Sequence, residues 1–187
     1  MVKNKFFFFF NKYGTVHMFV RTLFYKMLLK NIDFSSAIDI GSNKKSIFAD
    51  YCKINNKKCV TLDNDKSTNP DIVGDVLRMP IKDNAFDLAF ASMIIEHVDH
   101  YKLMEEIARV SKKYCVIITL KPCKNFWDTL DHIRPYTIVA LERLLAQYGF
   151  RAIKKFDLPF VDAIAVVGEK SKFTKQELEK LRIKGNY

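Results

Sequence analysis

Glycine and proline are scarce in this sequence, with six and five among its 187 residues. This composition excludes a collagen-like or mucin-like chain. Cysteine is also sparse, and the four cysteines form neither a C-x-x-C pair nor a Cys/His cluster with the spacing of a structural zinc site. We therefore expect no metal site, reduced thiols and a cytoplasmic location, because reducing compartments keep such thiols free.

Acidic residues are absent from residues 1–30, where six basic residues give a charge of +6. Residues 170–187 contain six basic residues against two acidic ones, whereas residues 31–169 contain 19 of each kind. The whole net charge of +10 therefore comes from the two ends of the chain. Basic ends suit nucleic acid or an anionic membrane surface, or they serve only to keep the chain solvated.

No apolar run is long enough to cross a bilayer. Residues 6–10 are all phenylalanine, but Asn11 and Lys12 end the run, so we predict neither a signal peptide nor a membrane span.

The next segment predicts an amphipathic helix, because its apolar residues recur at helical spacing: Val16, Phe19, Val20, Leu23, Phe24, Met27 and Leu28. We expect this helix to dock on the domain core, with an interfacial membrane helix as the alternative.

From residue 37 onward, short apolar runs alternate with helix-length patterns. This alternation predicts one α/β domain with a mostly parallel sheet. The expected strands are residues 37–40, 59–62, 71–74, 86–91, 115–120, 151–156 and 163–167. Expected helices begin at Asn43 or Lys44, at Tyr101 and at Thr137, and a charged helix closes the chain.

The turns after the first two strands contain candidate ligand contacts, because parallel α/β sheets bind ligands beyond the carboxyl ends of their strands. Gly41 can bring the backbone close to a ligand, and Asn43 tolerates a positive φ. Asp63 ends the second strand about 20 residues further on, where nucleotide-binding folds place a carboxylate for the ribose hydroxyls. Turn formation or helix capping is the alternative role for each aspartate.

Several segments together resemble a known family. They are AIDIGSNKKS at 37–46, VTLDND at 60–65, VGDVLRMPIKDNAFDLAFASMIIEHV at 73–98, HIRPYT at 132–137 and LERLLAQYGF at 141–150. In this order they resemble class I S-adenosylmethionine-dependent methyltransferases of the small type 11 group. The resemblance implies a Rossmann-like three-layer α/β/α sandwich whose seven-stranded, mostly parallel sheet has the order 3-2-1-4-5-7-6, with the last strand antiparallel. It also implies S-adenosylmethionine as cofactor.

The resemblance assigns cofactor roles to individual residues. Asp39 and the backbone around Gly41 and Asn43 would contact the amino and carboxylate groups of the methionine part. Asp63 would bind the ribose hydroxyls, and Asp75 would accept a hydrogen bond from the adenine amine. The residues expected beside the adenine ring and the sulfonium are Val76, Leu77, Ala91, Ser92 and Met93.

One departure from the family pattern lies in the glycine-rich turn. Of the three glycines of D-x-G-x-G-x-G, the chain keeps Gly41 and has Asn43 and Lys45 at the other two places. Asn43 can adopt the left-handed conformation. We expect Lys45 to narrow the approach of the following helix to the strand and so to weaken cofactor binding.

Four residues are candidates for catalysis: Glu96 and His97 after the fourth strand, and His132 and Arg134 after the fifth. His97 could take a proton from a hydroxyl nucleophile; alternatively, the turn at 96–98 only packs and caps the next helix. His132 and Arg134 could hold an acidic group of the substrate, or they could form surface ion pairs with Asp128 or Asp131.

The chain lacks an inserted substrate domain, an N-P-P-Y-like motif and an RNA-binding module, which favours a small-molecule or lipid-like methyl acceptor. A non-catalytic protein of the same fold, acting through its basic ends on nucleic acid or membrane, is the alternative. We expect a helical segment at 1–36 as a candidate lid, a cofactor-binding domain at 37–170 and a basic tail at 171–187. The sequence leaves the oligomeric state open.

Overall fold

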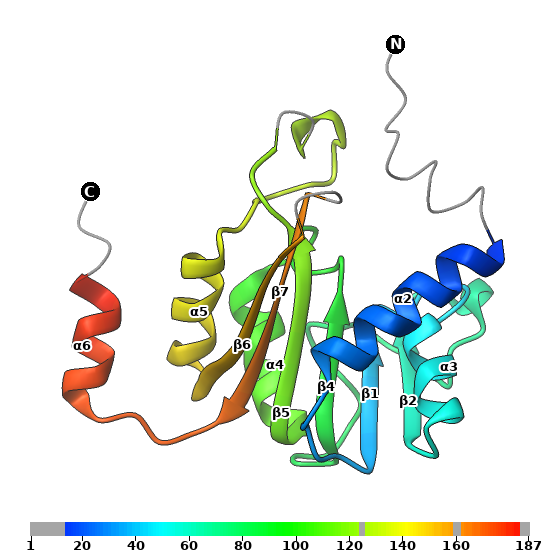
Figure 1. The fold of residues 1–187 in the computed structure, drawn as a ribbon, viewed down its shortest axis with the longest axis horizontal. Coiled ribbons are helices and arrows are strands. Elements are labelled where there is room, and N and C mark those ends of the chain that lie inside the picture. The colour runs from blue at the N-terminus through cyan, green and yellow to red at the C-terminus, as the bar shows by residue number, and fades with distance from the viewer. Residues whose placement is uncertain (1–13, 124–125, 159–161, 184–187) are drawn as a thin grey trace.

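The computed structural model describes residues 14–123, 126–158 and 162–183, and the phenylalanine run at 6–10 lies outside them. Seven strands form one sheet in the order β3-β2-β1-β4-β5-β7-β6 (Figure 1). The strands are β1 (Ser36–Ile40), β2 (Lys58–Asp63), β3 (Ile72–Val73), β4 (Phe86–Ser92), β5 (Ser111–Leu120), β6 (Phe150–Leu158) and β7 (Ala163–Lys170). Neighbouring strands from β3 to β5 are parallel, whereas β7 is antiparallel to both β5 and β6. The expected sheet order and the antiparallel last strand are confirmed.

Helices cover both faces of the sheet. They are α2 (Gly14–Leu28), α3 (Ile47–Ile54), α4 (His100–Val110), α5 (Ile138–Gln147) and α6 (Lys175–Ile183), with short 3-10 turns η1 (Lys66–Thr68) and η2 (Phe126–Asp128). Alternate residues along a strand point to opposite faces, so Ala89 and Ala91 of β4 join the core under α4 and α5, whereas Leu88 and Phe90 join the core under α2 and α3. The result is the expected three-layer α/β/α sandwich.

Helix α2 docks on the domain core with only part of the predicted face, since Leu28 is buried and Phe24 is half-buried against the core. Tyr25 and Leu28 are buried, while Val20, Leu23 and Met27 are 58%, 59% and 49% exposed. The reason is aromatic packing: the ring of Tyr25 meets those of Phe48, Tyr51 and Phe90 edge-on, at centroid distances of 5.9, 5.8 and 5.4 Å. Edge-to-face contacts of this kind are favourable, and they turn the helix so that an apolar stripe faces outward.

Among the described residues, no helix is both long enough and apolar enough to cross a bilayer.

Candidate active site

Strand β1 brings the predicted cofactor residues to one edge of the sheet. It lies between β2 and β4 and is parallel to both, and its last residue, Ile40, pairs with Leu62 and with Ala91. Asp63 and Ser92 follow these two partners directly. The carboxyl ends of three neighbouring strands therefore meet at one place, as ligand binding in this class of sheet requires.

The loop after β1 is shaped by two residues with positive φ. Gly41 has φ +70°, its N–H donates to Leu62 O at 2.8 Å, and a Cβ added there would come within 3.2 Å of Ile94. Asn43 has φ 54°, in the left-handed region as predicted. Its N–H donates to Asp63 Oδ2 at 2.8 Å, which ties the first loop to the end of β2.

Helix α3 begins later than the sequence suggested. Ser46 caps it, accepting a hydrogen bond from Ala49 N–H at 2.8 Å, so the first helical residue is Ile47 rather than Asn43 or Lys44. Lys45 consequently lies in the loop and is exposed. The expectation that Lys45 narrows the contact between helix and strand is wrong, because that contact starts beyond it.

Asp39 is a buried carboxylate on the face of β1 toward α2 and α3. It is 5% exposed and accepts a hydrogen bond from the Ser46 hydroxyl. Burial raises its pKa to about 6, and the Ser46 hydrogen bond and the positive charge of Arg21 on α2 partly offset this. In the same loop the Ser42 hydroxyl is buried and has no hydrogen-bond partner among the described residues.

Asp63 uses part of its hydrogen-bonding capacity to organise the edge. Oδ2 accepts from Asn43 N–H and Oδ1 accepts from Asp65 N–H at 2.9 Å. A carboxylate has about four lone-pair positions, so each oxygen keeps capacity for a further donor. The aspartate thus both forms the turn and remains able to bind a ligand.

Asp75 lies in the loop of residues 74–85, between β3 and β4. Its Oδ1 accepts from Leu77 N–H at 2.8 Å, and its Oδ2 has no hydrogen bond to another described residue. Val76 is buried and Leu77 is half-buried against the same core. The loop therefore presents a carboxylate oxygen next to an apolar surface.

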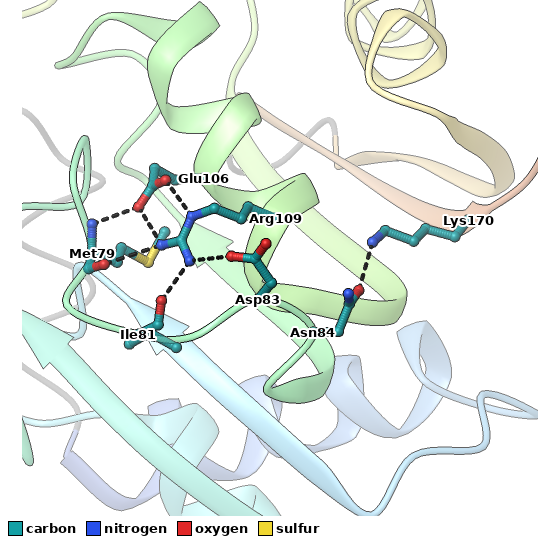
Figure 2. Close-up of polar contacts among 7 residues, drawn as sticks. All are labelled: Met79, Ile81, Asp83, Asn84, Glu106, Arg109 and Lys170. Carbon is teal, nitrogen blue, oxygen red and sulfur yellow. Dashed lines mark hydrogen bonds and ion pairs between the residues drawn. The ribbon is translucent and has the colours of Figure 1, made fainter.

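An ionic network on α4 fixes this loop (Figure 2). The guanidinium of Arg109 donates to Glu106 Oε1 at 2.7 Å, to Asp83 Oδ1 at 2.9 Å and to the carbonyl oxygens of Met79 and Ile81. Glu106 in turn accepts from Met79 N–H at 2.6 Å. The guanidinium lowers the pKa of Glu106 below its usual range, so the network stays ionised. Through Glu106 and Arg109 it binds both the backbone N–H and the carbonyl oxygen of Met79 to one helix.

The end of β4 places the residues expected beside the sulfonium. Ala91 is fully buried, Ser92 and Met93 are half-buried, and Met93 has φ 55° while its N–H donates to Ile118 O at 2.8 Å. The side chain of Ala91 belongs to the core under α4, so Ser92 and Met93 form the more accessible part of this turn.

The catalytic candidates lie after β4 and β5, two adjacent strands. His97 Nδ1 is 3.1 Å from Asp131 Oδ2, and the rings of His97 and His132 have centroids 4.8 Å apart. Helix α4 is capped by Asp99, which accepts from Tyr101 N–H at 3.0 Å, so the expectation of capping by the 96–98 turn is wrong. Arg134 is exposed and comes within 3.5 Å of His100 Nε2.

Sequence reasoning named Glu96 as a candidate but missed its burial beside these histidines. Glu96 is fully buried; Oε2 accepts from Thr119 Oγ1 at 2.8 Å, and Oε1 has no partner among the described residues. Burial raises the pKa of Glu96, and the adjacent imidazoles of His97 and His132 partly oppose this. In the sequence, the neighbouring acid and histidine at 96–97 and at 131–132 indicate possible polar sites. Only the fold shows that the two pairs lie side by side.

Comparison with known proteins identifies the class of this fold. Residues 38–119 match the family model described as a methyltransferase domain. The predicted resemblance to class I S-adenosylmethionine-dependent methyltransferases is therefore confirmed for this segment, and a solved structure of such an enzyme shares the fold.

Individual relatives are distant. A segment of 53 residues is 38% identical to the uncharacterized protein MJ0638 of Methanocaldococcus jannaschii, and it covers 27% of this chain but only 24% of that protein. A SAM-dependent methyltransferase from Archaeoglobus fulgidus has a TM-score of 0.68 and 17% identity, with 88% of this chain and 99% of that chain covered.

Two further solved structures share the fold. A SAM-dependent methyltransferase from Aquifex aeolicus has a TM-score of 0.60 and 18% identity over 78% of this chain and 88% of its own. Magnesium protoporphyrin IX methyltransferase from Synechocystis, solved with bound SAH, has a TM-score of 0.65 and 8% identity over 82% of each chain. At sequence identities this low, the similarity to these structures shows a shared fold only.

Replacing Arg109 by methionine tests the role of the ionic network. We expect Arg109→Met to lower the free energy of unfolding by about 1–3 kcal/mol, because buried carbonyls and Glu106 lose a charged partner. Urea denaturation measures this change, and Lys102→Met, at an exposed position on the same helix, is the matched control. Equal stability of the two variants would contradict the anchoring role.

Replacing Asp39 by asparagine tests the cost of its burial. The folded pKa of about 6 lies above the ordinary aspartate pKa of 3.8, so ionised Asp39 destabilises the fold above pH 6 and has no effect below about pH 4. We expect Asp39→Asn to stabilise the protein by about 1–3 kcal/mol at pH 7.5 and by nothing at pH 4. Urea denaturation at both pH values, with exposed Asp33→Asn as control, measures this; an equal effect at the two pH values would refute it.

Proposed function

We propose that this protein transfers the methyl group of S-adenosylmethionine to a small-molecule or lipid-like acceptor. The observation that carries the proposal is the meeting of three carboxylates, Asp39, Asp63 and Asp75, with the Gly41 turn at one edge of the sheet. Each carboxylate keeps capacity for a donor from a ligand. The proposed cofactor residues are Asp39, Gly41, Asn43, Asp63, Asp75, Val76, Leu77, Ala91, Ser92 and Met93.

The chemistry of these groups fits the parts of the cofactor. Asp39 is a buried carboxylate that a ligand ammonium would stabilise, and the unpartnered Ser42 hydroxyl lies in the same loop. Asp63 would accept from the two ribose hydroxyls, and the remaining oxygen of Asp75 would accept from the adenine amine above Val76 and Leu77. At Gly41 any side chain would crowd Ile94, so the close backbone approach depends on glycine.

The cofactor supplies a methyl group already activated by a positive sulfur, so the protein mainly aligns the acceptor and excludes water. Helix α2, within the segment at 1–36, is the candidate lid, because its Arg21 acts electrostatically on Asp39. A lid of this kind would close over the methionine end of the site. The cofactor domain then corresponds to residues 37–170 and the basic C-terminal segment to residues 171–187, in which Glu177 pairs with Arg151 of β6 at 2.8 Å.

We place the acceptor beside His97, His132 and Arg134. The two imidazoles form one polar cluster with Asp131, and such a cluster can assist the loss of a proton from an acceptor hydroxyl. Exposed Arg134 is suited to hold an acidic group of the acceptor. The alternative of a non-catalytic binding protein has no comparable support.

The outer face of α2 favours an anionic membrane surface as partner, rather than nucleic acid. Val20, Leu23 and Met27 form the outward apolar stripe, and Lys26 and Lys30 are exposed beside it. Residues 1–30 contain six basic residues and no acidic one. Apolar side chains flanked by lysines suit the boundary between lipid headgroups and acyl chains, and a lipid-like acceptor would be reached from there.

Calorimetric titration with S-adenosylmethionine tests the proposed cofactor contacts. We expect Asp63→Ala and Asp75→Ala each to weaken binding by about 1–3 kcal/mol, because each removes a charged hydrogen-bond acceptor. Asp33→Ala, before the opposite end of β1, is the control and should bind normally. Unchanged affinity in both site variants would remove them from the site, and absence of binding by the unmodified protein would refute the proposed function.

Sedimentation with lipid vesicles tests the membrane surface. We expect the full chain to bind phosphatidylglycerol vesicles more than phosphatidylcholine vesicles, with salt weakening the binding. A variant with Val20→Gln, Leu23→Gln and Met27→Gln should lose about tenfold or more in partition coefficient, because less apolar area enters the bilayer.

A matched control changes exposed apolar residues elsewhere, with Ile54→Gln on α3 and Val139→Gln on α5. If the control loses as much vesicle binding as the stripe variant, α2 is not the docking surface. Binding to RNA at the same salt, unaffected by the stripe changes, would point to nucleic acid as the partner.

A further inference from the structure

We propose that His97, Asp131 and His132 bind one divalent transition-metal ion of the zinc class. The site lies on the acceptor side, after β4 and β5. Metal binding stands on its own observations, whereas its use in catalysis rests on the function proposed above. The cysteine spacing gave no reason to expect it, because the ligands come from two loops that are 34 residues apart.

The three side chains are spaced as metal ligands. One ligand atom from each lies within 4.8 Å of the other two, and His97 Nδ1 is 3.1 Å from Asp131 Oδ2. Ligands about 2.0–2.1 Å from a tetrahedral zinc ion are about 3.3 Å apart. The first pair is close to that separation, and a small side-chain rotation would bring His132 into place.

His132 is held in a tautomer suited to coordination. Its Nδ1 lies 2.7 Å from the carbonyl oxygen of Phe126, which can only accept, so Nδ1 carries the proton and the lone pair is on Nε2. The ring also packs against that of Phe126 at a centroid distance of 4.5 Å. Metal-binding histidines commonly donate their other ring N–H to a carbonyl in this way, which fixes tautomer and orientation.

Glu96 provides a second, independent indication of a cation. Its carboxylate is fully buried, and Oε1 has no partner among the described residues. Its carbonyl oxygen accepts from Ile133 N–H at 2.7 Å, which holds the 96–97 turn against the loop that carries Asp131 and His132. A buried carboxylate with an unpaired oxygen is costly unless a positive charge lies nearby, and a divalent ion in this cluster supplies that charge.

The donor set selects the kind of metal. Two imidazole nitrogens and one carboxylate oxygen suit zinc, cobalt or iron, whereas magnesium and calcium prefer oxygen ligands alone. Three protein ligands leave at least one coordination position for water or for an acceptor oxygen.

This open position explains how the cluster could activate an acceptor. A hydroxyl bound to the metal loses its proton to solvent at a lower pH than a free hydroxyl. The oxygen then takes the methyl group as the bond from carbon to sulfur breaks, leaving a methyl ether and S-adenosylhomocysteine. The imidazole of His97 would act here by coordination instead of accepting the proton itself.

Cobalt titration of the full chain, stripped with a chelator, tests the proposal. We expect one equivalent of Co²⁺ to give visible d–d absorption bands, and Zn²⁺ to displace it. His97→Ala and His132→Ala should each lower the affinity by at least about tenfold. Asp131→Asn, at a largely exposed carboxylate, gives a variant with little risk to folding.

His100→Ala is the matched control, since His100 lies three residues from His97 but outside the cluster. Absence of cobalt bands, or equal binding by the control and the cluster variants, would overturn the proposal. Titration with S-adenosylmethionine is run in parallel: cobalt binding without cofactor binding would refute the proposed function and leave the metal site intact, and the reverse result would refute only the metal site.

Discussion

The position of β1 in the middle of the sheet is the constraint on which the rest of the structure depends. It is buried on both faces, by Ile38 and Ile40 on one side and Ala37 on the other, and it pairs in parallel with both β2 and β4. Parallel strands need crossover connections, so the loops that follow β1, β3 and β4 at the carboxyl edge each lead back toward the start of a further strand, through α3 after β1 and through α4 after β4. Apart from Asp63 at the end of β2, the candidate cofactor residues all lie in these loops or at the strand ends that precede them.

Many residues of the motif at 73–98 stabilise the fold instead of contacting a ligand. In the segment that follows β3, Gly74 is required because a Cβ would come within 2.9 Å of Pro80, and Asp83 binds Arg109. Asp87 accepts from the backbone of Ser35 and Ser36 and from the Ser35 hydroxyl. Burial alone would raise the pKa of Asp87, but these hydrogen bonds lower it below its usual range. Asp75, at the start of this motif, keeps one oxygen without a partner among the described residues.

The sequence predicted the sheet well because its strands are short apolar runs bounded by clear turn residues, and the positive φ of Asn43 followed from its side chain. The sequence did not predict features that depend on contacts between residues far apart in the chain. The face of α2 depends on Tyr25 meeting Phe48 and Phe90, two rings from other elements that themselves stack 3.9 Å apart. The pairing of His97 with Asp131 was equally hidden, because no local pattern shows which loops the sheet brings side by side.

The buried state of Asp39 has a consequence for any measurement of binding. With a pKa near 6, this carboxyl is only partly ionised in mildly acidic solution. A ligand ammonium placed against it would favour the carboxylate and so expel a proton into the buffer. The apparent heat of association would then vary with the ionisation enthalpy of the buffer, most strongly around that pH. Binding of a ligand beside β1 would therefore be coupled to the release of a proton from Asp39.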